Sequence, residues 1–299
     1  MKIRIGFGPP LRTALDDPGE LGALVDSLEG YGFDSLWLSE RLTGPGPDPL
    51  IAIAIAAGRS RRLRVGTGVL VLPGRNPVVL AKEIASLDRL SGGRFHPAVG
   101  LGAVEPREQA AFGVARNERA AWVDEALPLM RQLWSGEPVH HEGPRFPLDG
   151  VRLKVTPHQD PLEVWLGGRV PVELRRIGRL GDGWLPSFMT PDEVAEGWAV
   201  INEVAAEHGR AVPADHLGML VPYADGPLSD DVAALFAARR PEVDARDLVA
   251  GGLDDLRAKL QAYIAVGASK FVVLPLAAPA DWDAELSRLA EAVLPLQQS

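Results

Sequence analysis

The sequence contains no cysteine. Disulfide bonds, a catalytic thiol and thiolate metal sites are therefore excluded, and the composition fits the reducing cytoplasm. An excess of basic residues is also missing, because 31 Lys and Arg stand against 40 Asp and Glu and the net charge is −9 at pH 7. Proteins that bind nucleic acid usually carry a basic surface. We therefore expect an acidic cytoplasmic protein without a nucleic-acid partner.

Long apolar runs are absent as well. Residues 1–7 and the patch Ile51–Ala57 are short, whereas a membrane helix needs about 20 apolar residues. We expect neither a membrane segment nor a secretory signal.

The sequence has no P-loop and no nucleophile-elbow serine. His140 and His141 are adjacent, so on a strand they would point in opposite directions, and we expect a surface hairpin and no metal site.

The stretch from Arg62 to Gly102 predicts a strand, a helix and a second strand. Residues 63–71 are rich in Val and Leu, and Pro77–Leu90 has apolar residues at helical spacing after a proline suited to a first turn. Residues 94–99 predict the second strand. Both strands end in glycines, which allow close approach to the backbone. Because parallel α/β folds bind ligands at the carboxyl ends of their strands, these ends are a candidate site.

The same alternation extends along the chain and predicts one (β/α)8 TIM barrel over residues 1–299. The 299 residues and 46% hydrophobic content are sufficient for its core. A hairpin over Val139–Thr156 is expected after the fourth helix, and a second insertion over 224–247 is expected after the seventh strand. The predicted strands cover residues 2–8, 35–38, 63–71, 94–99, 162–166, 184–186, 217–223 and 270–274, each followed by a helix or by a helix and an insertion.

Several motifs resemble one family. They are FDSLWLSE, the run GTGVLVLPGRNPVVLAKEIASLDRLSGGR followed by AVGLG, EALPLMRQLWSGEPV, and PLEVWLGGRVPVELRRIGRLGDGWLPSF. Together they resemble the luciferase-like flavin- and deazaflavin-dependent monooxygenase and oxidoreductase family, the bacterial luciferase superfamily, and most closely its F420-dependent branch. The resemblance implies coenzyme F420 as the cofactor, with FMN as the alternative.

The resemblance also implies a set of site residues. Glu40 and Arg41 are the catalytic candidates, since relatives carry an acidic residue and a His at these two positions; a local ion pair is the alternative. Arg41 cannot exchange protons near neutral pH, and we expect it to lower the pKa of Glu40. The cofactor-binding candidates are Ser39, Thr67, Gly68, Val69, Leu101, Gly102, Leu166, Gly167, Gly168, Arg169 and Trp184.

Two of these candidates carry specific expectations. The resemblance implies a cis peptide between Gly68 and Val69 that bulges against the flavin ring; the alternative is that Gly68 merely relieves crowding inside the barrel. Arg169 follows two glycines just before a predicted helix start, where backbone amides favour a phosphate. The alternative is an ordinary turn with Arg169 facing solvent.

The leading functional hypothesis is an oxidoreductase that uses reduced F420 to transfer hydride to a small organic substrate. One alternative is a two-component monooxygenase that uses FMN and oxygen, with a reductase partner. Another is a flavin-binding protein without catalytic activity. The resemblance also implies that a homodimer is possible, because in many relatives the counterpart of the helix Pro77–Leu90 packs across a dimer.

Overall fold

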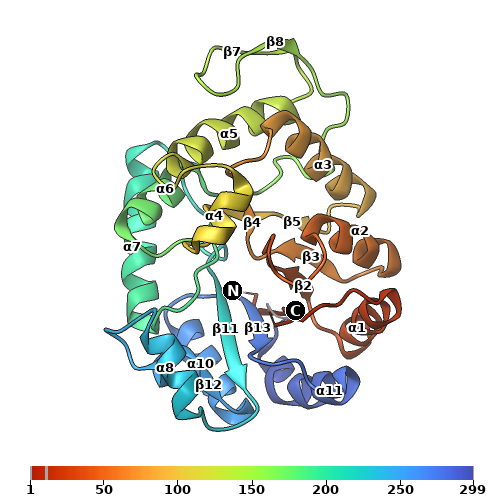
Figure 1. The fold of residues 1–299 in the computed structure, drawn as a ribbon, viewed down its shortest axis with the longest axis vertical. Coiled ribbons are helices and arrows are strands. Elements are labelled where there is room, and N and C mark those ends of the chain that lie inside the picture. The colour runs from red at the N-terminus through yellow and green to blue at the C-terminus, as the bar shows by residue number, and fades with distance from the viewer. Residues whose placement is uncertain (1, 11–12, 299) are drawn as a thin grey trace.

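The computed structural model describes residues 2–10 and 13–298. Its centre is a barrel of parallel strands surrounded by helices, as predicted (Figure 1). The barrel strands are β1 (Arg4–Phe7), β2 (Ser35–Leu38), β3 (Arg64–Thr67), β4 (Leu70–Val71), β5 (Phe95–His96), β6 (Ala98–Gly100), β9 (Trp165–Leu166), β10 (Gly183–Trp184), β11 (Gly218–Ala224) and β13 (Lys270–Pro275).

Two of the predicted barrel strands are interrupted. The strand expected over 63–71 divides into β3 and β4 at Gly68 and Val69, and the strand over 94–99 divides into β5 and β6 at Pro97. Hydrogen bonding therefore gives two sheets, in the orders β12-β11-β13-β1-β2-β3-β5 and β10-β9-β6-β4. Single bridges from Trp184 to Leu217 and from Ser187 to Leu220 connect β10 to β11. The short β12 (Ala250–Gly251) extends the edge beside β11.

Several helices begin where the sequence supplies both a proline and a cap. Asp17, Asp48 and Asn76 each precede a proline and accept hydrogen bonds from first-turn amides. The helices are α1 (Pro18–Tyr31), α2 (Pro49–Arg59), α3 (Pro77–Leu90), α4 (Pro106–Phe112), α5 (Arg119–Trp134), α6 (Pro171–Leu180), α7 (Pro191–Glu207), α8 (Asp230–Ala237), α9 (Ala245–Leu248), α10 (Leu253–Ala265), α11 (Trp282–Val293) and a 3-10 turn (Leu294–Leu296).

Both predicted insertions are present. The first is the antiparallel hairpin of β7 (Val139–His141) and β8 (Leu148–Val151), which projects beyond α5 in Figure 1. The second contains α8 and α9 and follows β11. His140 and His141 lie on the hairpin, and no group of three or more metal-ligating side chains occurs in the part of the chain that the structure describes. None of the helices within residues 2–10 and 13–298 is long and apolar enough to cross a membrane.

The barrel interior holds a small apolar cluster, which we call the plug: Trp37, Ala98, Trp165, Leu185 and Val272. Side chains alternate across a strand, so residues two positions before and after these point into the same interior. One cavity lies towards the carboxyl ends of the strands and a second towards their amino ends, and Trp37, Leu185 and Val272 line both. The plug therefore separates two internal sites.

Candidate active site

The cavity at the carboxyl ends of the strands has a volume of about 330 Å³. This is the edge where barrel enzymes bind their ligands. Its walls are mainly apolar and glycine-rich, which suits a flat organic ring. The lining residues are Gly8, Pro9, Trp37, Ser39, Glu40, Arg41, Gly68, Val69, Val71, Gly100, Leu101, Gly102, Ala103, Gly167, Gly168, Glu173, Leu185, Ser187, Phe188, Leu220, Pro222, Val272 and Leu274.

The peptide between Gly68 and Val69 is cis, as the resemblance implied. Neighbouring strands hold this peptide: Ser39 Oγ donates to the Gly68 carbonyl at 2.5 Å, and the Gly68 amide donates to the Leu38 carbonyl at 2.9 Å. A Cβ added to Gly100 would lie 2.7 Å from Val69, so the glycine makes room for that side chain. The alternative of crowding at Gly68 is not supported, because a Cβ there would meet no atom closer than 3.8 Å.

Glu40 is buried in the cavity wall and binds across to the following strand and loop. Its carboxylate accepts a hydrogen bond from the Val71 amide at 2.7 Å and another from the guanidinium of Arg75. Burial raises the pKa of Glu40 above its ordinary value, although Arg75 and the Val71 amide act in the opposite direction. The alternative of a local ion pair between Glu40 and Arg41 is therefore wrong, since each pairs with another residue. The expectation of a lowered pKa for Glu40 is wrong as well.

Arg41 lies at the edge of the cavity with its side chain about a quarter exposed. Its guanidinium is 3.4 Å from the carboxylate of Glu105, in the loop before α4. Glu108, within α4, accepts hydrogen bonds from the backbone amides of Leu42 and Thr43. The segment that follows β2 is thus fixed to α4, and Arg41 supplies a permanent positive charge at the mouth of the cavity.

The start of α6 differs from the expected phosphate site. The Glu173 carboxylate accepts hydrogen bonds from the backbone amides of Arg169, at 2.9 Å, and Val170, at 3.2 Å. A carboxylate therefore occupies the amides that were expected to bind phosphate. The Arg169 guanidinium is 39% exposed, lies 3.9 Å from Glu242, and does not line the cavity.

The structure brings together nine of the thirteen predicted site residues. Ser39, Glu40, Arg41, Gly68, Val69, Leu101, Gly102, Gly167 and Gly168 all line the cavity. Thr67, Leu166, Arg169 and Trp184 do not. Thr67 instead bonds the backbone of Ala98, and Trp184 donates its indole N–H to the Gly168 carbonyl at 2.9 Å. These two residues support the cavity wall from behind.

The apolar walls contributed by β2, β11 and β13 were not predicted from the sequence. Trp37 precedes Ser39 by two positions, and Leu220 with Pro222 and Val272 with Leu274 have the same spacing. Alternation along a strand was the available signal, since residues two apart share a face. Glu173 was not predicted either. A Glu at the third position of a helix often bonds back to the amide of the residue that precedes the helix, here Val170.

The residues present fit a flavin or a deazaflavin. An apolar wall and the open space beside Gly68 can accept a planar ring. Arg41 and Glu40 would face the ring from the end of β2.

Comparison with known proteins agrees with this geometry. Residues 2–238 match the family model described as luciferase-like monooxygenase. The chain is 33% identical over 229 residues to 4-hydroxyprotoasukamycin monooxygenase of Streptomyces nodosus subsp. asukaensis, covering 70% of this chain and 61% of that one. It is 31% identical over 191 residues to F420-dependent glucose-6-phosphate dehydrogenase of Nakamurella multipartita, covering 60% and 56%. Matches to curated relatives span from 36% to 61% of their own lengths.

A solved structure has the same fold over the whole chain. It is an F420-dependent secondary alcohol dehydrogenase in complex with an F420-acetone adduct, with a TM-score of 0.84, 19% identity and full coverage of both chains. The named relatives are enzymes. On the extent of the family match, this chain belongs to the luciferase-like monooxygenase family.

Proposed function

We propose that the protein is an oxidoreductase that uses reduced F420 to transfer hydride to a small organic substrate. The observation that carries the choice of cofactor is the Glu173 carboxylate at the start of α6. The phosphate monoester of FMN has a charge of about −1.5 to −2 at neutral pH, whereas the phosphodiester of F420 carries a single negative charge. At the phosphate itself, repulsion by Glu173 therefore disfavours the FMN monoester more than the F420 diester. The relatives named for F420 support the same choice.

The cofactor site would combine the α6 start with the glycine-rich strand ends. Gly167 and Gly168 would allow the tail to pass close to the backbone, and the exposed Arg169 would reach its phosphodiester from outside the cavity. Gly68 and Val69 would contact the ring. When bound, the reduced deazaflavin supplies the hydride.

The remaining apolar wall suits a small carbonyl compound. Leu220 and Leu274 line it from β11 and β13, and Phe188 closes it at the rim. Apolar walls bind the organic part of the substrate and exclude water, while the cation of Arg41 at the mouth stabilises negative charge that develops on a carbonyl oxygen. Glu40 is our candidate acid, because it is buried in the cavity wall and burial raises its pKa above the ordinary value.

A two-component FMN monooxygenase is the second candidate. It is supported by 33% sequence identity to a named monooxygenase across 70% of this chain. That function needs a reductase to deliver reduced FMN, and it needs a site that accepts a phosphate dianion.

Turnover assays can separate the two functions. The purified protein is mixed with oxidised F420 and a set of small secondary alcohols, and loss of the oxidised deazaflavin absorbance is followed without oxygen. We expect reduction of F420 with at least one alcohol. When reduced FMN is supplied, we expect the matching ketone to cause no oxygen consumption beyond the spontaneous oxidation of free reduced FMN. Oxygen consumption that depends on the ketone, with no F420 reduction, would favour the monooxygenase.

A further inference from the structure

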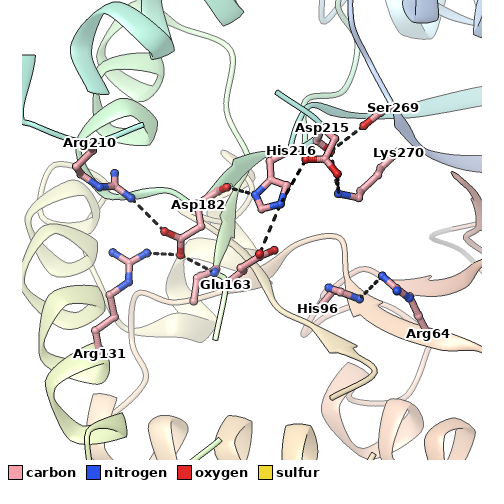
Figure 2. Close-up of polar contacts among 11 residues, drawn as sticks. Arg64, His96, Arg131, Glu163, Asp182, Arg210, Asp215, His216, Ser269 and Lys270 are labelled. Atoms are coloured by element: carbon pink, nitrogen blue, oxygen red, sulfur yellow. Dashed lines mark hydrogen bonds and ion pairs between the residues drawn. The ribbon is translucent and has the colours of Figure 1, made fainter. Parts of the chain in front are cut away.

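The second internal cavity lies at the amino ends of the barrel strands, below the plug. Its volume is about 290 Å³. Catalysis at the opposite end of the barrel does not use it. Figure 2 shows many of its polar side chains, which come from the starts of β3, β11 and β13 and from β5.

Most charges around this cavity are paired. Arg4 contacts Asp34 at 2.7 Å, and His216 lies 3.5 Å from Glu163. Glu163 is 36% exposed and belongs to the rim. Arg4 is thus paired with Asp34, and His216 lies beside a partly exposed carboxylate.

Arg64 is the exception. Within residues 2–10 and 13–298 no carboxylate lies close enough to Arg64 for an ion pair, and its guanidinium contacts the Nε2 atom of His96 at 3.4 Å. The guanidinium and the imidazole are both partly buried and both line the cavity. A partly buried guanidinium without a carboxylate favours an anion as its missing partner.

Lys270 adds a second cation from β13. Its ammonium donates to the Asp215 carbonyl at 2.8 Å and lies 3.7 Å from the Asp215 carboxylate, which is 51% exposed. The same ammonium sits 5.1 Å from the centre of the Trp165 ring in the plug. Lys270 is only 21% exposed, so its charge reaches the interior more directly than the charge of Asp215.

The state of His96 agrees with a surplus of positive charge. Burial first, and then the charges of Arg64, Lys270, Arg4 and His216, lower the pKa of His96 to about 3. The carboxylates of Asp34, Glu163 and Asp215 also line the cavity, and the pKa of His96 is lowered in their presence. An anion among these groups would relieve their mutual repulsion.

We propose that this cavity is a binding site for a phosphate-class oxyanion, held by Arg64 and Lys270 with His96 as a further hydrogen-bonding partner. An Arg fork and an adjacent ammonium match the geometry and charge of a phosphate dianion. The cavity also has room for the organic part of a small phosphomonoester, so the phosphate is either free or part of such a molecule.

Calorimetric titration of the full chain without cofactor tests the site. Inorganic phosphate and glycerol 3-phosphate are the two probes, and acetate is the singly charged comparison. We expect saturable binding of at least one phosphate probe and much weaker binding of acetate. Tighter binding of glycerol 3-phosphate would identify a phosphomonoester as the ligand, and tighter binding of inorganic phosphate would identify the free ion. Absence of binding by both probes overturns the proposal.

Variants locate the bound probe. Arg64→Gln and, separately, Lys270→Gln should each weaken binding about ten- to a hundredfold, because each removes a charge-assisted hydrogen bond. Arg61→Gln should leave binding unchanged, because Arg61 is exposed and lies three residues before Arg64. Arg169→Ala should also leave it unchanged, which separates this site from the proposed cofactor site. Binding that survives both cavity substitutions in folded protein, or that is lost in Arg169→Ala, overturns the proposal. Circular dichroism establishes that each variant is folded.

Discussion

Gly66 and Gly68 point into the same barrel two residues apart, yet their surroundings differ. A Cβ at Gly66 would lie 2.6 Å from the Trp37 ring, whereas a Cβ at Gly68 would face open space. Gly66→Val should therefore lower the free energy of unfolding by about 1–3 kcal/mol through overpacking. Gly68→Val should leave stability within about 1 kcal/mol of wild type and weaken cofactor binding about tenfold or more.

Denaturant unfolding and cofactor titration of both variants check this pair. Since Gly68→Val places atoms where we expect the ring, its defect should appear in affinity alone. The interpretation fails if Gly68→Val unfolds as readily as Gly66→Val while its folded fraction binds cofactor normally.

Glu40 and Arg41 are expected to affect the rate more than cofactor binding. Glu40→Gln keeps an oxygen that can accept from the Val71 amide but removes the acid, so hydride transfer under single-turnover conditions should slow about a hundredfold. Arg41→Ala should slow it about tenfold, because it removes a stabilising charge. If both variants stay within a factor of about three of wild type, under ~0.7 kcal/mol of barrier, the two residues are structural.

His96 predicts a dependence of stability on pH. Its pKa is about 3 in the folded protein against 6.5 as the ordinary value, so the unfolded chain binds the proton more readily. Stability is then lost as the pH falls from 6.5 towards 3. Between pH 6.5 and about pH 4.5 the wild type should lose about 2 kcal/mol more than His96→Gln.

Urea unfolding at several pH values measures this difference. His140→Gln is the control, because His140 lies exposed on the β7–β8 hairpin. If wild type and His96→Gln lose stability in parallel as the pH falls, the imidazole titrates normally. The surplus of positive charge inferred for the cavity at the amino ends of the strands would then lose its support.

At the scale of one element, the start of α6 determines the affinity for the phosphate group of the cofactor. Glu173→Gln can still accept from the Arg169 amide but removes the negative charge, so affinity for FMN should rise relative to affinity for riboflavin by about tenfold (~1.4 kcal/mol). Affinity for F420 should change less, because its diester carries a smaller charge.

Fluorescence titration with FMN and riboflavin measures this ratio. Glu105→Gln provides a matched control, since Glu105 is an exposed carboxylate that binds Arg41 and no helix amides. An unchanged ratio in Glu173→Gln would show that the tail phosphate lies elsewhere.

Individual elements were largely predictable because their signals are local. The helix expected over Pro77–Leu90 is α3 with the same bounds, and the strand expected over 35–38 is β2. A proline after a capping residue and a run of apolar residues determine such elements within a few positions. The breaks within two strands were not predicted, since they depend on how neighbouring strands hold Gly68–Val69 and Pro97.

At the scale of the whole molecule, the barrel was predictable but the contacts across it were not. Eight alternations and parallel topology place every strand end at one edge, which is why nine predicted residues gather there. The partner of Glu40 is Arg75, 35 positions away, and local sequence gives no reason to choose it over the adjacent Arg41. The cavity at the amino ends of the strands likewise combines side chains from several strands and the turns before them, and no local pattern in the sequence brings these together.

The two cavities give the molecule two ends with different chemistry. The cavity at the carboxyl ends of the strands is apolar, glycine-rich and bounded by Glu173. The cavity at the amino ends is lined by Arg64, His96 and Lys270. Since the plug lies between them, binding at one end can be measured while the other end is altered by substitution.

The choice of F420 over FMN is the central claim, and equilibrium binding tests it most directly. The protein without cofactor is titrated with oxidised F420 and with FMN under identical conditions, and the two dissociation constants are compared. We predict tighter binding of F420, by about tenfold or more, because the FMN phosphate carries the larger negative charge near Glu173. Tighter binding of FMN would contradict the account.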